Sequence, residues 1–75
     1  MIKEHDRVPL TEDLPEFGLE RGDIGTVVMI HAIPGYELEF VTLEGDTLAV
    51  ISAFPHQVRS LGKREIAQAR SLEHV

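Results

Sequence analysis

The side chains that could do acid–base or metal chemistry are scattered along this sequence. No two of its histidines have the i, i+4 helical or i, i+2 strand spacing that lets two imidazoles reach one metal ion. The four fall in separate segments, at His5, His31, His56 and His74. The chain has no cysteine, which excludes a disulfide and a zinc–thiolate site. The sequence therefore predicts no metal site and no cofactor.

Two carboxylates and a few serines are the remaining candidates for catalysis. Glu37 and Glu39 alternate with apolar residues, so they share one face of an expected strand. That face should be solvated, and a solvated carboxylate keeps an ordinary pKa. None of the serines stands in a nucleophile-elbow context; they are Ser52, Ser60 and Ser71. We expect no catalytic residue, no small-molecule substrate and a protein that is not an enzyme.

Charge is distributed unevenly along the chain. Residues 1–46 contain eleven acidic and three basic residues, whereas residues 47–75 contain two acidic and four basic ones. An acidic surface repels phosphate backbones, and the basic cluster includes no aromatic side chain on which a base could stack. That cluster consists of Arg59, Lys63, Arg64 and Arg70. Nucleic-acid binding is disfavoured, and a basic protein is the better match, although an acidic surface also simply aids solubility.

The 75 residues are enough for one domain with one core. The N-terminal sequence MIKEHDRV has no apolar stretch of the kind found in a signal peptide. Apolar runs elsewhere are too short to span a membrane. We expect a single cytoplasmic domain over residues 1–75, without a membrane segment.

The β-rich centre of the chain is the clearest structural signal. The sequence RGDIGTVVMIHAIPGYELEFVTLEGDTLAV predicts strands over residues 23–33, 36–42 and 47–54, separated by turns too tight to admit helices. Alternation places the side chains of the second and third of these strands in the core, namely Tyr36, Leu38, Phe40, Leu48 and Val50. Gly25 predicts a bulge or a close backbone approach, by which a short sheet curls.

Shorter elements flank this centre. Residues 6–10 predict a short edge strand, and residues 11–23 a long loop that Phe17 should anchor to the barrel. Residues 55–61 predict a single 3-10 turn followed by a last short strand that closes onto the first. Five strands in this arrangement predict a mainly β fold, an SH3-like barrel over about residues 3–61.

The sequence KREIAQARSLEHV has a different pattern. It consists of good helix formers, with a narrow apolar stripe formed by Ile66, Ala69 and Leu72. It predicts a short C-terminal α-helix over about residues 62–72. Such a helix is marginal alone, so we expect it to pack on the barrel or on a partner.

Both faces of the strand over residues 23–33 are apolar. We assign Ile24, Thr26, Val28 and Ile30 to the core, which leaves an outer stripe that the loop, the C-terminal helix or another chain must cover. If another chain covers it, the partner-binding candidates on the stripe and the loop are Leu14, Phe17, Val27, Met29 and Ile51.

Three stretches of the chain together resemble a known family. These are IKEHDRVPLTEDLPEFGLERGDIGTVVMI, FVTLEGDTLAVI and HQVRSLGKREIAQAR. They are similar to a small bacterial family of domains of unknown function, number four-nine-two-six. The resemblance implies an SH3-like fold, a free-standing small protein, no known catalytic residues, and a gene setting like that of antitoxin or immunity pairs. The stretch RGDIGTVVMI also resembles, more weakly, the strand-loop-strand element of KOW-type domains.

The expected function is that of a non-enzymatic protein-interaction module, an antitoxin-like or regulatory partner protein that binds another protein or itself. Two alternatives remain open. One is a KOW-like nucleic-acid or ribosome-associated domain, which salt-dependent retention on heparin or RNA would reveal. The other is an accessory domain of a multi-subunit enzyme, which only the fold suggests.

Overall fold

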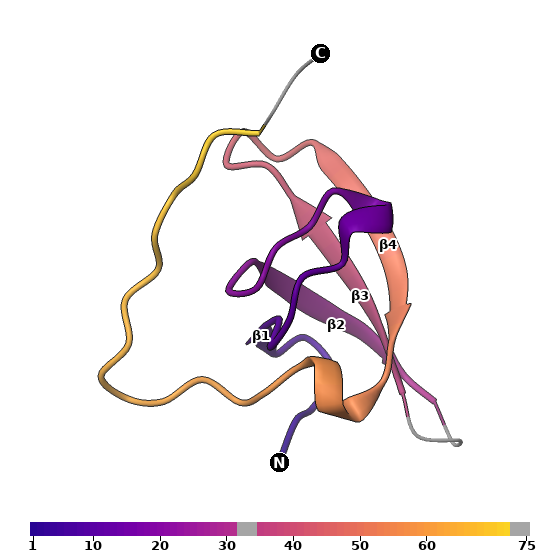
Figure 1. Cartoon of the computed structure of the whole chain (residues 1–75). Helices are drawn as coiled ribbons and strands as arrows, with labels where there is room; N and C mark the ends of the chain where they lie inside the picture. The colour runs from indigo at the N-terminus through magenta and orange to yellow at the C-terminus, as the bar shows by residue number, and fades with distance from the viewer. Residues whose placement is uncertain (32–34, 73–75) are drawn as a thin grey trace.

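A computed structural model of the protein describes residues 1–31 and 35–72. These residues form one four-stranded antiparallel sheet (Figure 1). The strands β1 (Arg7–Pro9), β2 (Ile24–Ile30), β3 (Tyr36–Val41) and β4 (Thr47–Ala53) are neighbours in chain order. Two 3-10 turns, η1 (Pro15–Phe17) and η2 (Pro55–Gln57), complete the elements. The mainly β class is confirmed. Over the described ranges there is no helix that could cross a membrane.

The predicted fifth strand is wrong, although the chain at this place does pair with the segment after β1. After η2, which confirms the predicted 3-10 turn, Val58 forms a single antiparallel bridge with Leu10. The Thr11 amide donates to the Gln57 carbonyl (2.8 Å) and the Arg59 amide to the Pro9 carbonyl (3.3 Å). A longer ladder cannot form, because β1 is three residues long and ends at a proline that has no N–H to donate.

The predicted faces of β2 are wrong in its first half, where Gly25 and Val27 are buried, and a bulge then interrupts the strand. Val27 lies opposite Leu38 and Met29 opposite Glu37, so Val28 is an extra residue without a partner on β3. Val27 is fully buried, at 0% exposure, while Val28 and Met29 are exposed. The outer apolar stripe of Val27 and Met29 therefore does not form. The predicted turn at Pro34 and the strand end at Ile33 lie outside the described residues.

The faces of β4 are also reversed relative to the prediction. Ala49, Ile51 and Ala53 lie opposite Phe40, Leu38 and Tyr36, which are the core side chains of β3. Ile51 is only 4% exposed, whereas Leu48 and Val50, predicted in the core, are exposed. A register shift next to Val41 inserts Leu48 as an extra residue. The run TLAVISA has apolar residues of both parities, so hydrophobicity alone does not determine the buried face.

The long loop between β1 and β2 is anchored by leucines and not by Phe17. Leu14 and Leu19 pair with each other in an isolated bridge and are both buried, whereas Phe17 is 44% exposed. Pro15 starts η1, and Gly18 ends it in the left-handed conformation (φ 71°) that favours glycine. With Val8, Leu10, Val58 and the core residues of the sheet, the two leucines complete the hydrophobic core.

The predicted C-terminal helix is absent. Residues 61–72, called the tail below, contain no helix, and Ile66 of the predicted stripe is 94% exposed. Figure 1 shows the tail leaving η2, arching away from the sheet and returning at the other end of the molecule. An isolated segment of this length is marginal as a helix in water, and most of it packs on nothing that would hold its apolar stripe.

Candidate interaction surface

The five residues predicted to bind a partner are divided between the core and the surface. Leu14, Val27 and Ile51 are core residues, so the predicted exposed parity of Ile51 is wrong. Phe17 and Met29 are exposed, but they lie on different elements, η1 and β2. On the outer face of the sheet, Glu37 of β3 separates Met29 from β4. A partner-binding role for Phe17 and Met29 stays a prediction.

The free edge of β4 is a surface that the sequence analysis missed. β4 pairs only with β3, and in the described part of the chain no other segment bonds to its backbone. Residues 47–58 contain no Asp, Glu, Lys or Arg, so the whole seven-residue strand is uncharged. Val50, at its centre, is 58% exposed. Uncharged edges of this length are rare in proteins, because their unpaired N–H and C=O groups can pair with another strand.

The opposite edge of the sheet has the protection that β4 lacks. β1 has only three residues, begins with a charged Arg7 and ends with Pro9. Val58 and its neighbours cover its C-terminal end through the bridge to Leu10. Short length, charge, proline and cover are the usual means by which proteins prevent edge-to-edge pairing. The β1 edge of the sheet is therefore protected against pairing with another strand, whereas the β4 edge is not.

Hydroxyl groups of β4 are already satisfied within the sheet. Ser52 Oγ donates to Glu37 Oε2 (2.5 Å), and Thr47 Oγ1 donates to Glu39 Oε2 (2.8 Å). His31 Nε2 lies 3.0 Å from the same oxygen of Glu37. The hydrogen bonds from Ser52 and His31 lower the pKa of Glu37 below its ordinary value. What remains free along β4 is its backbone and apolar side chains.

Ser52, Glu37 and His31 have the residue types of a hydrolytic triad but not its arrangement. In a triad the imidazole lies between the hydroxyl and the carboxylate, so that it can remove the hydroxyl proton. Here the carboxylate lies in the middle and accepts from both neighbours through one oxygen atom. The arrangement joins β3 to β4 and to the end of β2, and it does not activate Ser52 as a nucleophile. Among residues 1–31 and 35–72, no three His, Asp or Glu side chains are grouped as metal ligands.

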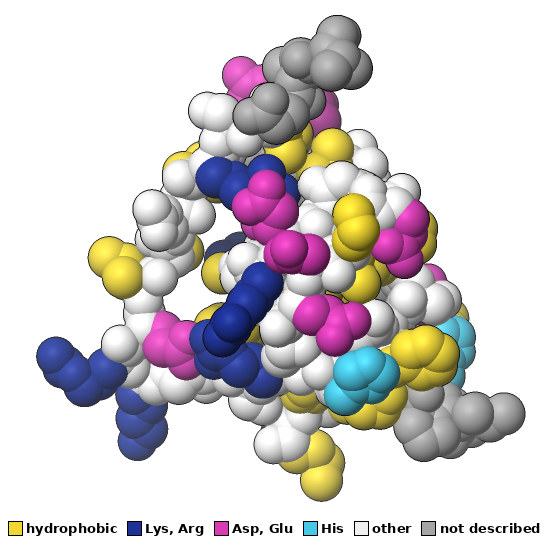
Figure 2. All heavy atoms as spheres, viewed as in Figure 1, with side chains coloured by type: hydrophobic (Ala, Val, Ile, Leu, Met, Phe, Trp, Pro, Cys, Tyr) yellow, Lys and Arg dark blue, Asp and Glu magenta, His cyan; other side chains and the backbone are white. Residues whose placement is uncertain are grey.

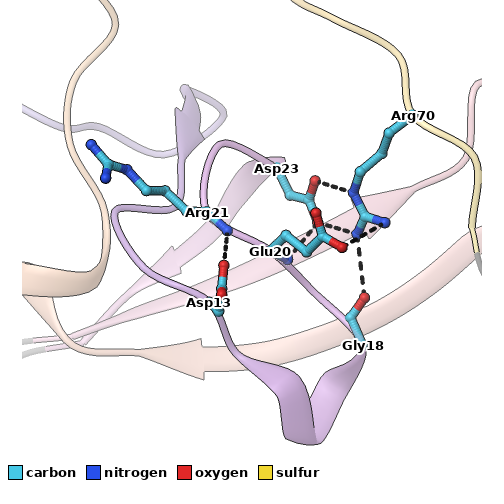
Figure 3. Close-up of polar contacts among 6 residues, drawn as sticks. All are labelled: Asp13, Gly18, Glu20, Arg21, Asp23 and Arg70. Carbon is cyan, nitrogen blue, oxygen red and sulfur yellow. Dashed lines mark hydrogen bonds and ion pairs between the residues drawn. The ribbon is translucent and has the colours of Figure 1, made fainter.

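The tail is fastened at its far end by Arg70 (Figure 3). The guanidinium group donates to both carboxylate oxygens of Asp23 (2.8 and 2.6 Å) and to the Gly18 carbonyl (3.3 Å), and lies 3.6 Å from Glu20. Burial raises the pKa of Asp23, but hydrogen bonds from Arg70 and from the Glu20 amide outweigh it and lower the pKa overall. The hydrogen bonds to Asp23 and the negative charges of Asp23 and Glu20 raise the pKa of Arg70.

The fastened tail borders a shallow depression beside β4. Its apolar lining includes Phe17, Leu48 and Leu72, and its polar lining consists of Arg70 and two acidic residues of the loop, Asp13 and Glu20. Its volume is about 610 Å³. Figure 2 shows, in contrast, an open space between the middle of the tail and the body of the protein. Sequence reasoning placed Arg70 in a basic cluster but gave no signal for its partner Asp23, which lies 47 positions away.

Comparison with known proteins identifies a family. The model of the family described as "Domain of unknown function (DUF4926)" matches residues 4–60. This range contains all four strands, both 3-10 turns and every buried core residue, and it ends before the tail. No curated protein and no solved structure matches the chain.

Proposed function

The chain belongs to the DUF4926 family of domains of unknown function, and from that premise we propose that it is a non-enzymatic protein-interaction module. The module works by strand addition, in which an extended segment pairs with the free edge of β4. The single observation that carries the proposal is the uncharged, unpaired β4 backbone with Val50 exposed at its centre.

Strand addition suits the chemistry of this edge. Main-chain hydrogen bonds supply the contact, and exposed side chains on alternate positions select the partner. Thr47 and Ser52 donate to β3 carboxylates, so an incoming strand meets no unsatisfied hydroxyl group. Phe54, exposed directly after β4 and stacked on His56 with ring centroids 5.9 Å apart, extends the apolar contact at one end.

The finer fold and setting belong to the same proposal. An SH3-like barrel is supported by the 3-10 turn η2 and by the bridge through which Val58 closes onto Leu10. The family resemblance supports a bacterial, cytoplasmic regulatory partner of the antitoxin-like kind. A basic or neutral partner is favoured over nucleic acid, because the net charge of the chain is -6.

Affinity capture with matched variants tests the proposal. Val50→Lys places a charge on the free edge of β4, whereas Val41→Lys places it at a similarly exposed position on the outer face of β3. We expect the wild-type protein and Val41→Lys to retain the same proteins from the native cell, and Val50→Lys to lose them. Equal capture by all three would reject the edge as the binding site. Salt-dependent retention on heparin would favour the KOW-like alternative instead.

A further inference from the structure

We propose that the strand that pairs with β4 is β4 of a second copy, so that two sheets join edge to edge in an antiparallel, two-fold symmetric dimer. This inference rests on the proposed function, because it names the partner for the same edge. Antiparallel pairing of one strand with its own copy is the arrangement that a two-fold axis produces.

The first argument is charge. Each copy carries a net charge of -6, so most of the surface of one copy repels most of the surface of another. The uncharged residues 47–58 form the longest exception that lies at a sheet edge; the other uncharged run, residues 24–36, includes β2, which β1 and β3 flank. Two acidic copies can therefore approach each other along β4 without placing like charges opposite one another.

The second argument is the fit of β4 to itself. With the two-fold axis at Val50, the two Val50 side chains meet on the outer face. On the inner face the small Ala49 of each copy lies opposite the large Ile51 of the other. Ala49 is only partly buried in the single chain, although it lies on the core face, so the neighbouring copy completes its cover. Large beside small is the pattern that packs without voids.

The third argument is the demand that the edge makes on its partner. The hydroxyl groups of Thr47 and Ser52 point to Glu39 and Glu37 on β3, so the partner strand needs neither a charge nor a hydroxyl donor. It needs backbone groups and a β-branched, uncharged side chain at its centre. β4 of a second copy provides both, because it has its own free backbone groups and Val50 at its centre.

The test is the oligomeric state of the full chain as a function of concentration. Sedimentation and light scattering of the wild-type protein should show a monomer–dimer equilibrium with a dissociation constant of about 10–100 μM, as for a small, transient interface. Val50→Lys should weaken the dimer at least about tenfold, because it places two like charges opposite each other at the axis. Val41→Lys, with a side chain 51% exposed in the wild type, is the matched control and should dimerise as the wild type does.

Amide hydrogen exchange of the wild-type protein keeps the inference testable if Val50→Lys fails to fold. The β4 amides that do not bond to β3 should exchange freely in dilute solution and become protected at high concentration. A wild-type monomer at about 1 mM, a dimer that Val50→Lys leaves intact, or edge amides whose protection ignores concentration would each overturn the dimer. None of these three results would reject strand addition by a different partner, which the capture experiment tests separately.

Discussion

At the scale of single residues, the backbone at Gly25 leaves no room for a side chain beside the Phe40 ring. A Cβ atom at position 25 would lie 2.8 Å from Phe40 Cζ, closer than carbon atoms can approach without displacement. Phe40 is almost fully buried, so its ring has no free space into which to move. The glycine lets β2 pass close to β3's largest core side chain, which is the close approach that the sequence predicted at this position.

Gly25→Ala should therefore destabilise the protein by about 1–3 kcal/mol, the usual cost of overpacking a core. Thermal or urea unfolding measures the loss. The double variant Gly25→Ala with Phe40→Leu is the control, because a smaller side chain makes room for the methyl group. We expect the two substitutions to be strongly non-additive. Additive losses would mean that the ring is not what the new methyl group meets.

Residue faces were predicted well only where polar and apolar residues alternate. In YELEFV the glutamates fix the outer face, and Leu38 and Phe40 are buried as predicted. In IGTVVMI and TLAVISA both faces carry apolar residues, so alternation leaves two choices. Bulges at Val28 and Leu48 then shift the parity within the strand. Because a bulge depends on pairing with another strand, the sequence of one strand does not reveal it.

At the scale of elements, the start of the tail is held by a compact turn. Glu65 accepts from the Arg59 guanidinium group (2.7 and 2.9 Å) and from the Gly62 amide (2.5 Å). These hydrogen bonds lower the pKa of Glu65 from 4.5 to about 2. Since the pKa is lowered on folding, the turn is stabilised fully above pH 4.5 and loses this stabilisation as the pH falls toward 2.

The chemical shift of the Gly62 amide proton should report this titration in an NMR experiment. We expect a midpoint near pH 2 in the wild-type protein, because the amide donates directly to the Glu65 carboxylate. In Arg59→Gln the midpoint should move up toward 4.5, since the main charged donor is gone. A wild-type midpoint near 4.5 would show that the turn does not form in solution.

Elements that local sequence signals define were predicted better than the helix, which only packing against the rest of the protein would stabilise. The four strands and the 3-10 turn η2 depend on local signals such as alternation and Pro55 and were predicted, whereas the predicted fifth strand is a single bridge. The C-terminal helix was inferred from helix propensity and a three-residue stripe alone. Propensity contributes little unless an apolar face is buried, and the tail leaves Ile66 exposed. The exposed edge of β4 could have been suspected from its uncharged sequence, but which strand lies at an edge depends on the sheet order.

At the scale of the whole molecule, we expect the domain to fold without the tail. The hydrophobic core ends at Val58 and the family match at residue 60. A chain truncated after Ser60 should therefore keep the amide spectrum of the four strands and unfold cooperatively. Its melting temperature should fall by only a few degrees, because the main contacts that truncation removes are partly exposed ion pairs, Arg70 with Asp23 and Arg59 with Glu65.

The full-length chain is the reference for that comparison. If the truncated chain lost its dispersed spectrum, the tail would be part of the folding unit. The sequence predicted an outer apolar stripe on β2 that the loop, the C-terminal helix or another chain must cover. In the structure Val27 is buried, and exposed apolar residues lie on β4, on η1 and on β2 from the bulge onward.

The bridge between Leu10 and Val58 has a consequence for the order of events during synthesis. Residues 9–11 find backbone partners at residues 57–59, near the end of the family match. The Thr11 hydroxyl group also donates to the His56 carbonyl (2.6 Å). During synthesis β1 can pair with β2 first, but its other side gains these partners only after residues 57–59 have left the ribosome. The tail follows this segment in the sequence and contributes no residue to the described core, so closure of the bridge does not require it.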